Sequence, residues 1–111
     1  MKQWLSAILL TLICLQGRAQ KVYSVKYSSE ADFKVFVVKY ASEADLKVYK
    51  VKYASEAGQN DGKWFFVDYA GEAGKKIYFV DYLGQADLKV YFVNYSSEAG
   101  WVDNSKKHLL Y

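Results

Sequence analysis

Apolar and polar residues alternate along most of this chain in short runs that share one pattern. In KVYSVKY (21–27), KVFVVKY (34–40) and KVYKVKY (47–53), valine or an aromatic residue stands at every second position. A period of two is typical of a β-strand with one buried face, and valine, tyrosine and phenylalanine are favoured in strands. The chain has no proline that would interrupt a sheet. The pattern therefore predicts strands of about six residues, separated by short turns.

These runs belong to a repeat of thirteen residues. When places are counted from the lysine that opens each unit, place five is always Val, place seven always Tyr and place eleven always Ala. The units open at Lys21, Lys34, Lys47, Lys63, Lys76 and Lys89. One unit is too small to bury its own apolar face, so a repeat this regular predicts an array in which the copies cover one another.

Within each unit the strand and the turn can be assigned by place. Places three, five and seven share one strand face, and we expect this Tyr-Val-Tyr face to be buried, with the lysine at place one extending over the ring at place three. Four units then continue with Ser and Glu-Ala, which predicts one helical turn capped by the serine. Place twelve is Asp or Gly, and we expect it in the left-handed region, which both residues tolerate. The capping serines are Ser29, Ser42, Ser55 and Ser97.

The two halves of the repeat array differ in charge, and this difference predicts how the strands pair. Place six is Lys in units one to three and Asp or Asn in units four to six. Like charges opposite each other on a sheet are unfavourable, so we expect units three or four apart to pair, with Lys26 meeting Asp68 and Lys39 meeting Asp81. The fold class is then all-β: a closed toroidal array of short strands from six 13-residue repeats plus a degenerate seventh, residues 102–111, wound in two circuits.

The third unit carries three extra residues, around 59–62. From its position we expect this insertion to be a surface excursion, with contact to a partner as the alternative.

The first nineteen residues have the composition of a signal peptide. Lys2 precedes an apolar run, 4–15, and small residues at 17 and 19 predict cleavage before Gln20, which leaves one domain, 20–111. A lipoprotein signal at Cys14 is the alternative, and nothing after Ala19 resembles a membrane span. We therefore expect an exported protein in the periplasm, at the cell surface or in the extracellular medium.

Removal of this segment changes the balance of charge and of cysteine. The mature chain keeps 13 basic and 12 acidic residues, a net charge of +1, which argues against a nucleic-acid partner. Cys14 is the single cysteine, so no disulfide can hold the mature domain together, and packing must do so. We expect a monomer.

The sequence contains no constellation of residues that names a reaction. His108 is the single histidine, without a cysteine partner or a marked nucleophile, so we predict no catalytic residue, no cofactor and no metal site. The alternative function is a calcium- or glycan-binding module. Calcium would use the acidic turns (Glu30 with Asp32, Glu43 with Asp45, Gln85 with Asp87), and a glycan would use an aromatic stripe of Phe66, Phe79 and Phe92 if that stripe is exposed. We expect these three rings to be core.

The repeated KVYxVxYxSEAD phrase, followed by GW and a tail containing SKKHLLY, resembles the septoil knot domain family over residues 21–111. The resemblance implies a small, all-β, secreted or cell-surface domain whose backbone traces a knot with seven crossings, and it assigns no biochemical role. The insertion in the third unit departs from the regular repeat. Our prediction is a knotted, non-enzymatic structural or interaction domain, with an unknown protein or glycan as its possible partner.

Overall fold

A computed structural model describes residues 19–111, so all but the last residue of the predicted signal peptide lies outside the described part. Each repeat begins with a strand, and each strand is followed by a single 3-10 turn. The six strands are β1 (Lys21–Ser24), β2 (Phe33–Val37), β3 (Leu46–Lys50), β4 (Lys63–Phe66), β5 (Lys75–Phe79) and β6 (Leu88–Phe92). The chain ends in a two-residue strand, β7 (Gly100–Trp101), and a 3-10 helix, η7 (Asn104–Leu110).

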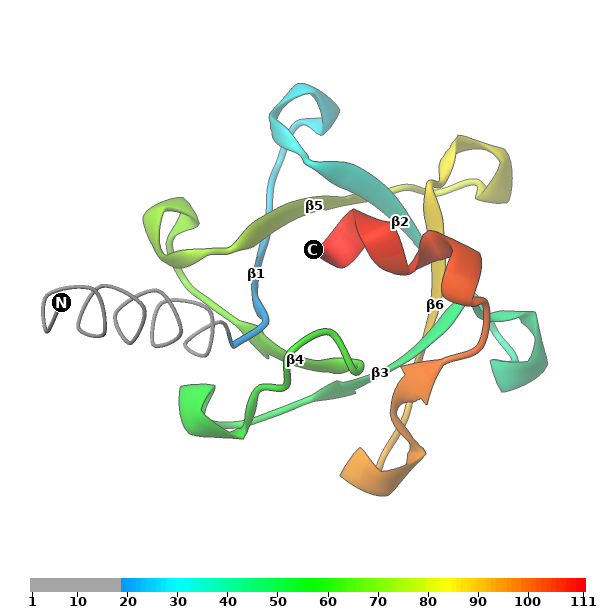
Figure 1. The fold of residues 1–111 in the computed structure, drawn as a ribbon. Coiled ribbons are helices and arrows are strands. Elements are labelled where there is room, and N and C mark those ends of the chain that lie inside the picture. Colours follow the sequence, from blue (N-terminus) through cyan, green and yellow to red (C-terminus); the bar gives the residue numbers. More distant parts are fainter. Residues whose placement is uncertain (1–18) are drawn as a thin grey trace, which may run out of the picture.

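The six repeat strands form a closed ring in which strands from the two halves of the chain alternate (Figure 1). The order around the ring is β4, β1, β5, β2, β6, β3, and β3 pairs with β4 to close it. All six pairings are parallel, and all except the closing one join units three or four apart. The predicted all-β toroidal array and its long-range pairing are confirmed.

Equivalent places of the repeat do not lie opposite each other in neighbouring strands, because the strands are shifted by two residues along their length. Lys21, at place one, lies opposite Phe65, at place three of its unit, and Val22 lies opposite Lys75. An even shift keeps inward side chains inward and tilts the strands around the ring.

The same shift separates the charges that the sequence suggested as partners. Among residues 19–111 the ion pairs are Lys63 with Asp61 and Lys89 with Asp45, so the predicted pairs of Lys26 with Asp68 and Lys39 with Asp81 are wrong.

The core inside the ring comes from a different strand face than predicted. Place two and the last place of the repeat point inward, and the side chains at place two are fully buried: Val22, Val35, Val48, Trp64, Ile77 and Val90. Trp64 is the largest of these, and its Nε1 has no hydrogen-bond partner among the described residues. The aromatic residues at place three are only half-buried. The prediction for this face is wrong at places three and seven, because place three lies on the outer face of the strand and the chain has left the sheet before place seven. At place five it is confirmed only in units one to three, where Val25, Val38 and Val51 are buried.

The turns project outward from the ring and give it six corners (Figure 1). The predicted single helical turn is present in all six units, as η1 (Ser28–Glu30), η2 (Ala41–Glu43), η3 (Ala54–Glu56), η4 (Ala70–Glu72), η5 (Leu83–Gln85) and η6 (Ser96–Glu98). The predicted serine caps are wrong, because the residue before each turn is the tyrosine of place seven and the serines lie within the turns.

Among the place-twelve residues only Gly100 has a positive φ, of 154°, so the left-handed prediction is wrong in the other five units. The aspartates have another use there. Asp32, Asp45 and Asp87 each accept a hydrogen bond from the backbone N–H of a lysine at place one of a distant unit, at 2.8 to 2.9 Å. An aspartate at place twelve therefore fastens one circuit of the chain to the other.

The tail closes one mouth of the ring instead of adding a seventh full unit. β7 pairs antiparallel with β3, and η7 lies across the opening with Leu110 in the core (Figure 1). The insertion anchors this tail. Asn60, only 5% exposed, donates from Nδ2 to the Lys107 carbonyl oxygen at 3.1 Å and accepts from Trp101 Nε1. The expected surface excursion is thus only partly right, because its middle residue is buried.

The other mouth of the ring holds the three phenylalanines of place four. Phe66, Phe79 and Phe92 are partly buried and pack against the core cluster, as expected. The Lys50 ammonium lies 4.4 Å from the Phe92 ring centroid and 5.3 Å from that of Phe66, within cation–π range.

Candidate functional site

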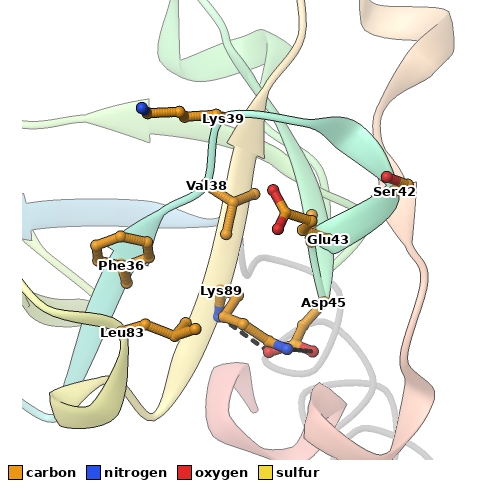
Figure 2. A pocket seen from close by; sticks show the side chains of 9 residues that line it. Phe36, Val38, Lys39, Ser42, Glu43, Asp45, Leu83 and Lys89 are labelled. Atoms are coloured by element: carbon orange, nitrogen blue, oxygen red, sulfur yellow. Dashed lines mark hydrogen bonds and ion pairs between the residues drawn. The ribbon is translucent and has the colours of Figure 1, made fainter.

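A groove of about 460 Å³ lies beside the corner of the second unit (Figure 2). Its lining is Phe36, Val38, Lys39, Ser42, Glu43, Ala44, Asp45, Leu83 and Lys89. In Figure 2, Phe36 and Leu83 stand on one side of the groove, and Ser42 and Glu43 on the other. The groove therefore combines an apolar wall with a hydroxyl and a carboxylate, and with Lys89 its lining comes from three units of the repeat.

The base of the groove is a fixed pair of charges. Asp45 is 6% exposed, its Oδ2 accepts from the Lys89 backbone N–H at 2.9 Å, and its backbone N–H donates to the Lys89 carbonyl oxygen at 2.8 Å. The Lys89 Nζ lies 4.0 Å from Asp45 Oδ1. These bonds hold the start of β3 against β6, so Asp45 is committed to the fold before any ligand arrives.

Leu83 makes this corner unlike the others. Place eight is Ser or Ala in the other five units, whereas Leu83 is large and 53% exposed. An exposed leucine beside the half-buried ring of Phe36 gives the groove an apolar surface that a serine or alanine would not provide.

The six tyrosines at place seven form a second candidate surface, one ring at each corner. Their exposed fractions are close to one another, between 65% and 71%: Tyr27, Tyr40, Tyr53, Tyr69, Tyr82 and Tyr95. Each tyrosine comes directly before its 3-10 turn, three residues before the glutamate or glutamine that ends the turn. A tyrosine ring and a carboxylate or amide on one exposed corner suit contact with a polar partner that has an apolar face.

The acidic turns do not gather into a metal site. Asp32, Asp45 and Asp87 use a carboxylate oxygen on backbone N–H groups. In residues 19–111 no group of three or more His, Cys, Asp or Glu side chains is placed to hold a metal ion.

His108 lies exposed in η7, with its Nδ1 2.9 Å from the Ser105 carbonyl oxygen. Asp103 lies directly before η7 as its N-cap, and its side chain accepts from the Ser105 backbone N–H. The Ser105 hydroxyl and backbone N–H both donate to Asp103 and lower the pKa of that carboxyl below its ordinary value. Both interactions are local to the tail, and the Asp103 side chain caps the start of η7.

Sequence reasoning missed these surfaces although the signals were present. The tyrosines were assigned to the core because they follow the alternating pattern, which the strands do not sustain as far as place seven. Leu83 is the only large residue at place eight of the repeat. A large side chain at a place that is otherwise serine or alanine could have indicated the groove from the sequence.

The fold and its repeated corners define a class: a closed all-β ring built from repeats. Across the described residues, no helix is of a length and apolarity that would let it cross a membrane. The family described as the 7(1) septoil knot domain matches residues 19–102, and the chain belongs to this family. No curated protein and no solved structure matches the chain significantly.

Proposed function

We propose that this chain is an exported, monomeric, non-enzymatic interaction domain that contacts its partner through the tyrosine corners. The observation that carries the proposal is the exposure of all six place-seven tyrosines, between 65% and 71%. The apolar run and small residues of 1–19 support export.

The comparison of place seven with place six supports a role outside the fold. Both places are exposed, but place six has changed from Lys26, Lys39 and Lys52 to Asp68, Asp81 and Asn94. Place seven is therefore tyrosine in every unit although the exposed place next to it varies. Tyrosine is enriched at protein interfaces, where its ring supplies area and its hydroxyl a hydrogen bond.

The arrangement of the corners favours a partner with repeated features. The six turns point outward around one ring (Figure 1), so several corners can be engaged together. Weak contacts that are engaged simultaneously raise the apparent affinity without any single strong site.

A triple variant tests the proposal: Tyr27→Ser, Tyr53→Ser and Tyr82→Ser. If the tyrosines serve a partner, the free energy of unfolding changes by no more than about 0.5 kcal/mol per site, while binding of the labelled protein to the surface of the cells that export it is lost. The matched control changes the preceding residues, Lys26, Lys52 and Asp81, to Ser. A loss of more than about 1 kcal/mol per tyrosine with binding retained would show that these rings serve the fold.

Export is tested separately by mass spectrometry of the protein recovered outside the cytoplasm. We expect the chain to begin at Gln20. A chain that retains residues 1–19 and remains in the cytoplasm would contradict this part of the proposal alone.

A glycan is the second candidate partner, and the groove at Leu83 favours it. Sugar rings pair an apolar face with hydroxyl groups, and the groove offers Phe36 and Leu83 beside Ser42 and Glu43. Leu83→Ala gives this corner the residue that three other units carry at place eight, so we expect the fold to be kept. Binding on a glycan array should be lost in Leu83→Ala and kept in Ala70→Ser, and an array without any wild-type signal would count against a glycan partner.

The acidic turns do not favour calcium as a ligand, because the place-twelve aspartates already accept hydrogen bonds from backbone N–H groups. We expect a chelator to leave the thermal midpoint unchanged. An increase of several degrees on adding calcium would reverse this choice.

A further inference from the structure

Phe79 differs from the two other phenylalanines at its mouth of the ring. The ring centroids of Phe66 and Phe92 are 6.5 Å apart, and the Lys50 ammonium lies over both rings, at 5.3 Å and 4.4 Å. Among residues 19–111, the Phe79 ring contacts no other aromatic ring and no cation, although its side chain is only half-buried. One phenyl ring of this mouth is therefore left without an ammonium partner.

The strand register explains how Lys50 reaches two rings. In the order of the ring, β3 lies between β6 and β4. Lys50 lies opposite Trp64, which comes two residues before Phe66, and Val48 lies opposite Phe92. A side chain at this position therefore has a phenylalanine diagonally across from it on each neighbouring strand, and a long side chain can reach such diagonal neighbours.

Ser24 has the same position between Phe66 and Phe79. β1 lies between β4 and β5, Ser24 lies opposite Ile77, which comes two residues before Phe79, and Val22 lies opposite Phe66. The Ser24 side chain is exposed and too short to extend over either ring. The repeat therefore creates the position of Lys50 a second time, beside Phe79, without supplying the ammonium group.

The rest of the described chain also leaves the Phe79 ring accessible. Val37, which lies on the other side of Phe79, is 41% exposed and carries no charge. Lys26 and Lys39, which follow Ser24 and Val37 by two residues, are exposed, and neither ammonium lies over the Phe79 ring. The helix η7 lies across the opposite mouth. A cation from outside the chain can therefore approach this ring.

We propose that the Phe79 ring, between Ser24 and Val37, binds the ammonium group of a lysine side chain that a partner protein presents. A phenyl ring attracts a cation placed within about 6 Å of its centroid. A lysine is favoured as the occupant because Lys50 shows that a lysine side chain fits over the rings of this mouth. The Ser24 hydroxyl can accept a hydrogen bond from the bound ammonium. This contact is separate from the tyrosine corners and does not depend on the function proposed for them.

The test is an NMR titration of the purified protein with two probes, Nα-acetyl-lysine-N-methylamide and its norleucine analogue, which differ only in the ammonium group. We expect the lysine probe to shift the Phe79 ring signals and to bind about two- to fivefold more tightly than the norleucine probe, which is the strength of an exposed cation–π contact expressed as a ratio of affinities. Phe79→Leu keeps an apolar side chain and should remove this difference between the probes.

A second variant tests the site without altering Phe79. Ser24→Lys supplies an ammonium group from within the chain, so it should abolish the preference for the lysine probe. The ε-methylene signal of the introduced side chain should also move upfield, because it lies over phenyl rings. Ser28→Lys adds the same charge at an exposed corner and is the matched control. It should show no upfield shift and should leave probe binding unchanged.

Four results would overturn the assignment. The first three are norleucine binding as tightly as lysine, an undiminished preference for lysine in a folded Phe79→Leu variant, and an ε-methylene signal in Ser24→Lys that matches the one in Ser28→Lys. The fourth is a shift of the Phe79 signals with protein concentration alone, which would assign this mouth to a second copy of the chain. None of them bears on the tyrosine corners, whose test uses other residues and another readout.

Discussion

At the scale of the residue, each place of the repeat has one physical task, and aspartate at place twelve shows this most clearly. Asp45 is 6% exposed and joins β3 to β6 through the Lys89 backbone N–H, forty-four residues away. Its own carbonyl oxygen accepts from the backbone N–H groups of Val102 and Asp103 in the tail. One side chain and its backbone therefore hold three segments together.

We expect Asp45→Ala to reduce the free energy of unfolding by about 1–3 kcal/mol, because the Lys89 N–H loses its acceptor in a partly buried site. Asp45→Asn keeps an oxygen acceptor and should cost less. Urea unfolding of the two variants, with Asp87→Ala as an exposed equivalent, measures the difference. Equal stability of Asp45→Ala and the native chain would show that this bond contributes nothing.

At the scale of the element, the insertion and the tail depend on each other. Asn60 has a positive φ of 84°, lies under the tail and bonds both Trp101 and Lys107. Gly62, with φ 90°, brings the backbone so near the Lys47 carbonyl oxygen that a Cβ would collide with it. The three extra residues thus turn the chain sharply and give the last eleven residues their anchor.

We expect Asn60→Gly, which tolerates the same φ, to loosen η7 and to reduce stability by about 1–3 kcal/mol through the lost side-chain bonds. Amide exchange of residues 104–110 should accelerate more than exchange in the ring strands. Asn94→Gly, on an exposed place six, is the control. Uniform acceleration over the whole chain would contradict a local anchor.

The tail should also respond to acid. The pKa of Asp103 is lowered in the folded protein by Ser105, so its contribution to stability is present above its unfolded pKa and is lost as pH falls through the folded value. We therefore expect Trp101 fluorescence to report loosening of the tail below about pH 4, before the ring unfolds. Asp103→Asn should remove this step, and a step that persists in Asp103→Asn would assign it to another carboxyl.

At the scale of the whole molecule, stability comes from interleaving distant copies of one unit. β1, β2 and β3 occupy alternate positions of the ring, β5 and β6 fill the positions between them, and β4 closes it. Closure leaves few free strand edges, which explains how a domain without a disulfide can avoid edge-to-edge association.

We predict that the backbone is knotted. We also predict that it folds slowly, on the order of 1 s or longer, because strands more than forty residues apart must pair before their apolar side chains are buried. A knot can persist in the denatured chain, so refolding from urea should be faster than first folding after cell-free synthesis. Equal rates in the two experiments, both in milliseconds, would argue against a knot.

The sequence was sufficient to predict the strands, the turns, the long-range pairing and the closed ring. The strands and turns followed from periodicity, whereas the pairing followed from the change at place six, Lys26 to Asp68. The predicted ion pairs were wrong because neighbouring strands are shifted by two residues. This register is set by the tilt of the strands that close the ring, and the sequence of a single unit does not encode it. The tyrosine corners and the Leu83 groove were missed because the point at which the chain leaves the sheet determines what is exposed.

By itself, the sequence determined that thirteen-residue units with strand periodicity must cover one another, since no unit can bury its own apolar side chains. Only the tertiary structure decided which side chains those are. The two-residue shift and the short strands place Val22 and its equivalents inside and leave Tyr27 and its equivalents in solvent. Alternation along a strand fixes two faces, but the curvature of the closed ring selects the face that becomes the core.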